Sequence, residues 1–315
     1  MVEDGALCAS KRSEMDKFDV MTQGTHTLLS GCEGKSAMDR KGETLVSARL
    51  SVRYAGKPAV LRNVELEIRQ GEVLGLVGQS GSGKSTLAMA MLGLLDAKHA
   101  EVKGTIRLQD CDLLQLKDKE LRELRGRALA LVLQSPLSSL NPALKVRTQL
   151  REAWRAHAAG TKDDCNRAVG AALASVSLPG DDEFLRKYPA QMSVGQAQRV
   201  LIAMAVMHRP ALLIADEATS ALDVITQSEI LALFAQLNRE TGMAILYISH
   251  DLPSVAGICH RIAILHAGEI VEYGPTEEIF ANPQHEYTRR LMAALPQMPV
   301  RGVSVLKQDA AAGAL

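Results

Sequence analysis

The segment Gly78–Thr86, which reads GQSGSGKST, constrains the fold of this chain more than any other stretch. It fits the pattern G-x-x-x-x-G-K-[ST], in which backbone amides surround the phosphates of a bound nucleotide. A short apolar run, Val73–Val77, precedes it, and an amphipathic segment, Leu87–Leu95, follows it. These flanks predict a buried strand, a loop and a helix in that order, which is the context that the pattern requires. A glycine-rich turn with an incidental lysine is the alternative interpretation.

The residue types in this segment suit the binding of phosphate oxygens. Its glycines allow backbone conformations and close approaches that a Cβ atom would prevent, so successive N–H groups can point at an anion. Lys84 offers a mobile positive charge to β- and γ-phosphates, and the Ser85 hydroxyl can bind Mg²⁺. The predicted nucleotide-binding residues are Gly78, Ser80, Gly81, Gly83, Lys84, Ser85 and Thr86.

Composition narrows the class of protein further. The 315 residues suffice for one large α/β domain or two ordinary ones, and 36 basic side chains balance 36 acidic ones, so nothing global indicates a nucleic-acid partner. No apolar run approaches the roughly 18 residues that span a bilayer, and the acidic N-terminus does not resemble a signal peptide, so we expect a cytosolic protein. The five scattered cysteines include no C-x-x-C pair, which argues against a disulfide framework or a metal site.

Hydrophobic patterning predicts an α/β fold. Apolar and polar residues alternate over Leu45–Tyr54 and again over Val64–Ile68, as in half-buried antiparallel strands. Apolar runs at 128–133, 211–215, 244–248 and 262–265 indicate buried parallel strands. A helical pattern over about 136–200 interrupts them. We therefore expect a mainly parallel core sheet, an antiparallel β subdomain and an inserted α-helical subdomain.

The two ends of the chain lack this patterning. We expect a disordered N-terminal tail at 1–43, a patterned domain at 44–296 and a frayed C-terminal tail at 297–315. Met38 lies just before the first strand pattern, so translation from Met38 is an alternative to translation from Met1. Near the end of the domain, the Thr276 hydroxyl is predicted to cap a helix.

Polar residues follow three of the predicted buried strands. Gln134 follows the run at 128–133, the pair Asp216-Glu217 follows the run at 211–215, and His250 follows the run at 244–248. Ligands bind at the carboxyl ends of strands in parallel sheets, so we expect these side chains at one site. An aspartate there would anchor Mg²⁺, and Glu217 would polarise an attacking water as general base. A helix N-cap is the alternative role for the acidic pair.

These features together closely resemble the nucleotide-binding subunit of ATP-binding cassette (ABC) transporters, a branch of the P-loop NTPases, over about residues 44–296. The segment Met192–Gln196, which reads MSVGQ, is similar to the family signature L-S-G-G-Q and decides the resemblance. The other matching features are Gln134 as the Q-loop glutamine, Ser220–Asp223 as the D-loop, His250 as the switch histidine and Tyr54 as the A-loop aromatic.

The resemblance implies a role for each of these residues. ATP and Mg²⁺ would be the ligands, with Tyr54 stacked on adenine, unless it is only a sheet-edge tyrosine. Gln134 would contact Mg²⁺ and the attacking water, alongside the metal-binding Ser85 and Asp216. His250 would contact the γ-phosphate, unless it is only a packed or capping histidine. The implied catalytic residues are Glu217, His250, Gln134 and Lys84, and Ser193, Gly195 and Gln196 would complete a nucleotide site on an opposing subunit.

One residue departs from the family pattern, and two segments narrow the branch. Val194 stands where glycine is usual, which predicts reduced turnover at the site that this signature serves. Segments Gln134–Pro142 and Asn282–Leu291 are similar to those of importer ATPases for oligopeptides, dipeptides and nickel. Some relatives carry a C-terminal cysteine cluster, but no cysteine follows Cys259, so no iron–sulfur cluster is expected.

This branch implies a set of partners and a location. The expected partners are integral-membrane permease subunits, a second ABC ATPase subunit and, indirectly, an extracytoplasmic substrate-binding protein. A heterodimer of ATPase subunits is favoured and a homodimer is the alternative, and the chain would lie peripherally on the cytoplasmic face of the membrane. A peptide is the favoured substrate and nickel or another small solute the alternative. A non-transport ABC ATPase, an exporter ATPase and a P-loop kinase fit the motifs less well.

Overall fold

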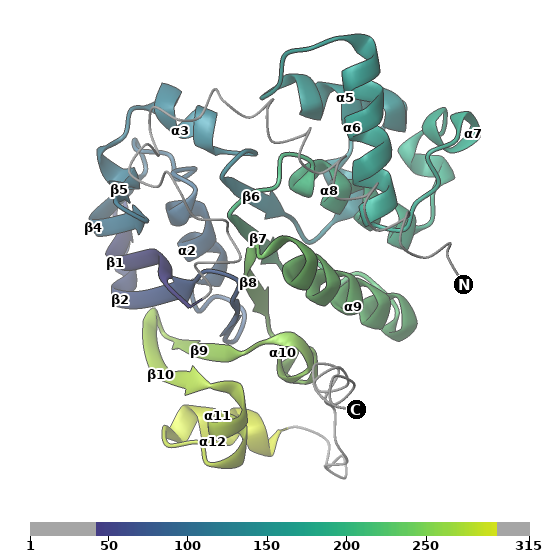
Figure 1. The fold of residues 1–315 in the computed structure, drawn as a ribbon. Coiled ribbons are helices and arrows are strands. Elements are labelled where there is room, and N and C mark those ends of the chain that lie inside the picture. Colours follow the sequence, from purple (N-terminus) through teal and green to yellow (C-terminus); the bar gives the residue numbers. More distant parts are fainter. Residues whose placement is uncertain (1–41, 295–315) are drawn as a thin grey trace, which may run out of the picture. The chain divides into compact units, whose positions relative to one another are not determined.

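Two β-sheets organise residues 42–294, which are the residues that the computed structural model describes (Figure 1). The larger sheet has six strands in the order β10-β9-β3-β8-β7-β6, and the smaller has four in the order β2-β1-β4-β5. The predicted tails lie outside the described residues, apart from Gly42 and Glu43. The strands of the larger sheet are β3 (Val73–Val77), β6 (Leu129–Val132), β7 (Leu212–Asp216), β8 (Ala244–Ser249), β9 (Arg261–His266) and β10 (Glu269–Pro275). Those of the smaller sheet are β1 (Thr44–Tyr54), β2 (Ala59–Arg69), β4 (Ala100–Leu108) and β5 (Cys111–Asp112).

Strand pairing confirms the predicted α/β fold class. In the larger sheet, β6, β7, β8, β3 and β9 are parallel, and β10 pairs with β9 in the antiparallel sense. The pairs of the smaller sheet are antiparallel. Strands β3, β7 and β8 are buried along their whole length, as expected where both faces of a sheet are covered. Strand β1 instead alternates between buried and more exposed positions, as a half-buried strand does.

The connection between β6 and β7 consists of helices and the loops that join them. Figure 1 shows α5, α6 and α7 gathered at the upper right, beyond the end of the sheet that carries β6. The boundary of about 136–200 for an inserted subdomain stays a prediction. The helices of this connection are α4 (Pro136–Ser139), α5 (Val146–Arg155), α6 (Lys162–Ser175), α7 (Asp182–Leu185), η4 (Pro189–Gln191) and α8 (Val194–Val206). The remaining helices are α2 (Lys84–Met91), η3 (Leu113–Gln115), α3 (Asp118–Leu124), α9 (Val224–Thr241), α10 (Leu252–Ile258), α11 (Thr276–Ala281) and α12 (Glu286–Ala293).

The predicted cap of the penultimate helix is wrong. Helix α11 does begin at Thr276, but Pro275 occupies the capping position. The Thr276 hydroxyl donates instead to the carbonyl oxygen of Cys259, at 2.8 Å, and the side chain is 6% exposed. A proline with its fixed φ already directs the chain into the first turn, so the hydroxyl is available to join α11 to the segment after α10.

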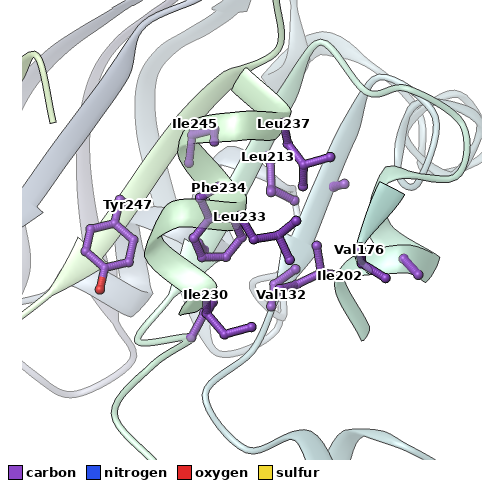
Figure 2. Close-up of a cluster of buried hydrophobic side chains, with 14 of the residues drawn as sticks. Val132, Val176, Ile202, Leu213, Ile230, Leu233, Phe234, Leu237, Ile245 and Tyr247 are labelled. Carbon is purple, nitrogen blue, oxygen red and sulfur yellow. The ribbon is translucent and has the colours of Figure 1, made fainter. Parts of the chain in front are cut away.

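The larger sheet separates two hydrophobic cores. Successive residues of β7 point to opposite faces, so Leu213 enters one core while Leu212 and Ile214 enter the other. Figure 2 shows the first core, in which Phe234 and its neighbours on α9 point towards β7 and β8. Packing on both faces holds the strands of this sheet in fixed positions relative to one another. Their carboxyl ends, where the predicted site residues lie, are therefore held by the fold itself.

We expect Ile230→Val to lower the free energy of unfolding by about 1 kcal/mol, because it removes a buried methylene group and leaves a small cavity. Ile230 lies on α9 within the core of Figure 2 and is 0% exposed. Ile225→Val on the same helix is the matched control, since Ile225 is 74% exposed. Urea denaturation of the two variants measures the difference. Equal destabilisation would contradict the assignment of this face of α9 to the core.

Candidate active site

The structure explains why glycine is required at three positions of the loop between β3 and α2. Gly81 and Gly83 have φ values of 81° and 109°, which lie in the left-handed region that side chains disfavour. Gly78 instead lies against β9, where an added Cβ would stand 2.2 Å from the carbonyl oxygen of Leu265. The sequence pattern therefore follows from two left-handed residues and one close backbone contact.

Lys84 folds back over this loop. Its side chain is buried, with 5% exposed, and Nζ donates to the carbonyl oxygens of Gly78 at 2.7 Å and Gln79 at 3.0 Å. Burial lowers the pKa of Lys84, and the nearby carboxylates of Glu217 and Asp216 act in the opposite direction. The ammonium group is thus held at the loop, close to both acidic residues.

Asp216 ends β7 with an oxygen that is suited to bind a metal. The residue is 7% exposed, and burial raises the pKa of its carboxyl, while a hydrogen bond with Ser85 acts in the opposite direction. Within the described part of the chain, its buried Oδ1 has no hydrogen-bond partner. An unsatisfied buried carboxylate oxygen beside a hydroxyl offers the hard oxygen ligands that Mg²⁺ prefers, so these residues fit that ion.

Glu217 and His250 meet at the carboxyl ends of two neighbouring strands. Asp216 of β7 lies opposite Ile248 of β8, so the residues that follow each strand emerge side by side. Nδ1 of His250 lies 3.3 Å from Oε1 of Glu217. The backbone N–H of Glu217 also donates to Ile248 at 2.9 Å, and its φ of 48° places it in the left-handed region. A strained backbone held by its neighbours is typical of functional sites.

Gln134 lies further along the same edge of the sheet. It follows β6, whose Val132 lies opposite Ala215 of β7, so it comes one strand beyond Asp216. Its side chain is exposed. The fold thus gathers Lys84, Ser85, Asp216, Glu217 and His250, with Gln134 at the next strand end.

Tyr54 ends β1 in the smaller sheet, opposite Ala100 of β4. It lines an open hollow of about 360 Å³, together with Arg53, Ala55 and the segment 97–101. These lining residues belong to the smaller sheet and its connections, and they include neither Lys84 nor Asp216. The adenine-stacking role of Tyr54 stays a prediction.

The signature segment forms the start of α8. The Ser193 hydroxyl accepts from the Gln196 N–H at 3.1 Å, and the Gln196 amide oxygen accepts from the Ser193 N–H at 3.2 Å. This capping box sets the start of α8 at Val194. Gly195 lies against α9, since an added Cβ would stand 2.7 Å from Cγ2 of Thr226. Val194 has helical backbone and is 38% exposed, so the valine causes no left-handed strain.

One contact to the loop involves a residue that the sequence analysis did not assign to the site. Tyr287 on α12 lies within the predicted branch segment, and its hydroxyl accepts from the backbone N–H of Gln79 at 3.1 Å. The two residues are 208 positions apart. No local pattern could have predicted this contact, because it depends on how α12 returns to the sheet.

Comparison with known families identifies two regions of the chain. Residues 61–220 match the family described as ABC transporter. Residues 271–311 match the family described as oligopeptide/dipeptide transporter, C-terminal region. The first match includes the glycine-rich loop, the signature segment and Glu217, and the second includes Tyr287.

Individual proteins agree with these matches. The dipeptide transport ATP-binding protein DppD of Bacillus subtilis is 39% identical over 257 residues, which cover 81% of this chain and 77% of that protein. DppD of Escherichia coli K12 is 40% identical, with 79% and 77% covered. The glutathione import ATP-binding protein GsiA of Escherichia coli O157:H7 is 41% identical over 77% of this chain but 40% of its own length.

Solved structures show the same fold. The dimeric ATP-binding cassette MJ0796, in a post-hydrolysis state with ADP and phosphate, aligns with a TM-score of 0.63 and 27% identity over 73% of this chain and 98% of its own. CbiO1 of Clostridium perfringens, part of an ABC transporter complex, aligns with a TM-score of 0.67 and 26% identity over 81% and 96%. None of the helices within residues 42–294 is long and apolar enough to cross a bilayer. With its cassette fold, its loop geometry and these similarities, the chain belongs to the ATPase subunits of ABC transporters, in the oligopeptide and dipeptide transporter branch.

Proposed function

We propose that this chain is the ATP-hydrolysing subunit of a peptide-type importer, which couples ATP binding and hydrolysis to uptake through membrane permease subunits. The observation that carries the proposal is the meeting of Glu217 and His250, 3.3 Å apart, beside Lys84 and Asp216. The match of residues 271–311 to the C-terminal region of oligopeptide and dipeptide transporters supports the branch.

ATP binding would use the glycine-rich loop and the residues beside it. The loop amides and Lys84 bind the β- and γ-phosphates: the ammonium keeps the Gly78 and Gln79 carbonyls as partners and offers its third N–H to a phosphate oxygen. Ser85 and Asp216 would hold Mg²⁺, with Gln134 approaching from the end of β6, and the ion would neutralise charge that develops on the phosphates. Tyr54 would stack on the adenine ring.

Hydrolysis would use the pair of residues at the ends of β7 and β8. Glu217 accepts the proton of the attacking water as general base. When Nδ1 of His250 carries a proton, it donates to Oε1 of Glu217 and fixes the orientation of that carboxylate. When Nε2 of His250 is protonated as well, it can donate to an oxygen of the γ-phosphate. The base and the residue that orients it are thus carried by neighbouring strands.

The signature segment would serve a site on an opposing ATPase subunit. Ser193 and Gly195 lie at the N-terminus of α8, where backbone N–H groups and the helix dipole favour a phosphate. Next to it, Val224 and Ile225 at the start of α9 are 80% and 74% exposed. These apolar side chains support a covering subunit at this surface. A second, different ATPase subunit is our proposal, with a homodimer as the alternative.

Val194→Gly should raise the ATPase rate of the assembled transporter by a few-fold. Glycine removes a β-branched side chain from the position that faces the opposing nucleotide, while the capping box of Ser193 and Gln196 stays intact. Steady-state phosphate release by the purified complex measures this effect. Val206→Gly, at the other end of α8, controls for the loss of a valine from the helix. An unchanged rate in Val194→Gly would count against any effect of Val194 on turnover.

Peptide is the substrate class that the similar proteins favour, because their names specify dipeptide and glutathione. We place the chain peripherally on the cytoplasmic face of the membrane.

Mild-detergent purification of the tagged native protein, followed by mass spectrometry, tests the assignment to an importer. We expect two permeases, a second cassette ATPase and a substrate-binding protein in the purified material. That binding protein can then be titrated with di- and oligopeptides and with Ni²⁺.

The outcomes of this purification separate the alternatives. Tight binding of peptides would support the proposal, whereas binding of Ni²⁺ alone would move the chain to the nickel importers. Ribosomal or DNA-repair proteins, in place of permeases, would leave the ATPase assignment standing and overturn the transport function. An export permease as the sole membrane partner would overturn the direction of transport.

A further inference from the structure

We infer that Tyr287 is a positioning residue for the phosphate-binding loop, and that it acts through the Gly78–Gln79 peptide group on Lys84. The N–H of this peptide group, on Gln79, donates to the Tyr287 hydroxyl at 3.1 Å. The carbonyl of the same peptide group, on Gly78, accepts from Nζ of Lys84 at 2.7 Å. Because a peptide group is planar, a bond at its N–H end fixes the direction of its C=O end.

Tyr287 is held firmly enough to act as this anchor. It is 8% exposed, and its ring stacks on that of His266 at the end of β9, with centroids 3.8 Å apart and an interplanar angle of 23°. Helix α12 is fixed in turn by Glu272 of β10, whose carboxylate accepts from the N–H groups of Gln284 at 2.8 Å and His285 at 3.1 Å. The hydroxyl position is therefore set by the β9–β10 hairpin and not by the loop.

The Gly78–Gln79 peptide group needs such an anchor. Gly78 must be glycine because of the Leu265 carbonyl, and glycine gives its neighbouring peptide groups more rotational freedom than other residues do. If this peptide group rotated by half a turn, its N–H would face the Lys84 ammonium in place of its C=O. Two donors would then oppose each other at a buried position, which is unfavourable. Lys84 thus excludes the reversed orientation, and the Tyr287 hydroxyl holds the plane of the peptide group so that its C=O stays directed at the ammonium.

This inference rests on the proposed contact of Lys84 with the β- and γ-phosphates. Tyr287→Phe removes the hydroxyl and keeps the ring that stacks on His266. We expect it to weaken binding of N-methylanthraniloyl-ATP to the full-length chain by about fivefold, the loss typical of one neutral hydrogen bond. In the assembled transporter, the KM for ATP should rise by a similar factor with little change in kcat.

Tyr273→Phe is the matched control. The Tyr273 hydroxyl on β10 donates to the carbonyl oxygen of Glu67 at 2.5 Å, so this variant also loses one bond from a tyrosine to the backbone, but at a β-strand outside the loop. Both variants should unfold at slightly lower temperature. Only Tyr287→Phe should change nucleotide affinity, and equal weakening in both would assign a merely structural role to Tyr287 and overturn the inference.

A double-mutant cycle with Lys84→Ala tests whether Tyr287 acts through Lys84. In the Lys84→Ala chain, adding Tyr287→Phe should change the dissociation constant less than about 1.5-fold, which is near additivity error. If Tyr287→Phe lowered nucleotide affinity fivefold both in the parental chain and in the Lys84→Ala chain, the inference would be overturned while the role of Lys84 would stand. Parental affinity in Lys84→Ala alone would instead refute the proposed role of Lys84 and the inference with it. If Tyr287→Phe fails to fold, His266→Leu replaces it, since this variant removes the ring stack on Tyr287 and keeps the Tyr287 hydroxyl. It should also weaken binding of the nucleotide. Parental nucleotide affinity in His266→Leu would overturn the inference.

Discussion

Glu217→Gln should slow ATP hydrolysis by roughly a hundredfold to ten-thousandfold while ATP binding stays close to the parental affinity. Glutamine keeps the size and the hydrogen-bonding carbonyl of the side chain but cannot accept a proton from water. The 3.3 Å contact with His250 can persist through the amide oxygen. ATP should therefore trap the two ATPase subunits in a closed, undissociated state, since the step that reopens them is removed.

Two measurements, one on the assembled transporter and one on its detached ATPase subunits, check this result. Phosphate release gives the rate, and size-exclusion chromatography of the detached ATPase subunits with ATP and Mg²⁺ reports the closed state. Glu240→Gln, at an exposed position near the end of α9, controls for the loss of a surface carboxylate. Hydrolysis by Glu217→Gln at the parental rate would remove Glu217 as the general base. Loss of ATP affinity would assign it to binding rather than to chemistry.

Lys84→Ala should weaken nucleotide binding itself, by roughly tenfold to a hundredfold, because charge-assisted hydrogen bonds are among the strongest in proteins. The side chain is buried, its ammonium donates to the loop carbonyls, and two carboxylates are near enough to raise its pKa. Its removal leaves the β- and γ-phosphates without their positive partner in a partly desolvated site. Hydrolysis at saturating ATP should fall as well, since the phosphates are no longer held in place.

Titration with N-methylanthraniloyl-ATP measures the affinity, and circular dichroism confirms that the variant folds. Lys103→Ala is the control, because its ammonium is exposed and pairs with Glu101 on the surface of β4. The pair of predictions for Glu217 and Lys84 separates chemistry from binding. If Glu217→Gln and Lys84→Ala both lost only nucleotide binding, or both lost only hydrolysis, the assignment of Glu217 to chemistry and Lys84 to binding would be wrong.

Much of the fold could be predicted because its strands are covered on both faces. Strands β7 and β8 are apolar runs up to a polar last residue, Asp216 or Ser249, and a further polar residue follows each. The ends of these strands and the residues beyond them were therefore visible in the sequence. Helix boundaries were less accurate: the helix predicted at Leu87–Leu95 is α2 at Lys84–Met91, because the loop geometry at Gly83 sets its start and the apolar stripe does not.

The parts that could not be predicted depend on long-range contacts or on backbone geometry. The hydrogen bond between Tyr287 and Gln79 joins distant segments, and no periodicity encodes it. The left-handed φ of Glu217 is equally hidden, since a glutamate there gives no local sign of strain. Thr276 shows the reverse case, where a favourable capping residue is used for a tertiary contact instead.

The fixed pairing of β7 with β8 has a consequence for control of the enzyme. Because Glu217 and His250 directly follow adjacent strands that lie between two packed cores, their backbone positions cannot change without disturbing the sheet. Gln134 is placed differently, at a strand end that leads directly into the helices α4 to α8. A signal from a permease would therefore leave the backbone that carries the proton acceptor in place. It would act by moving Gln134, and the signature segment of the opposing subunit, towards the Glu217–His250 pair.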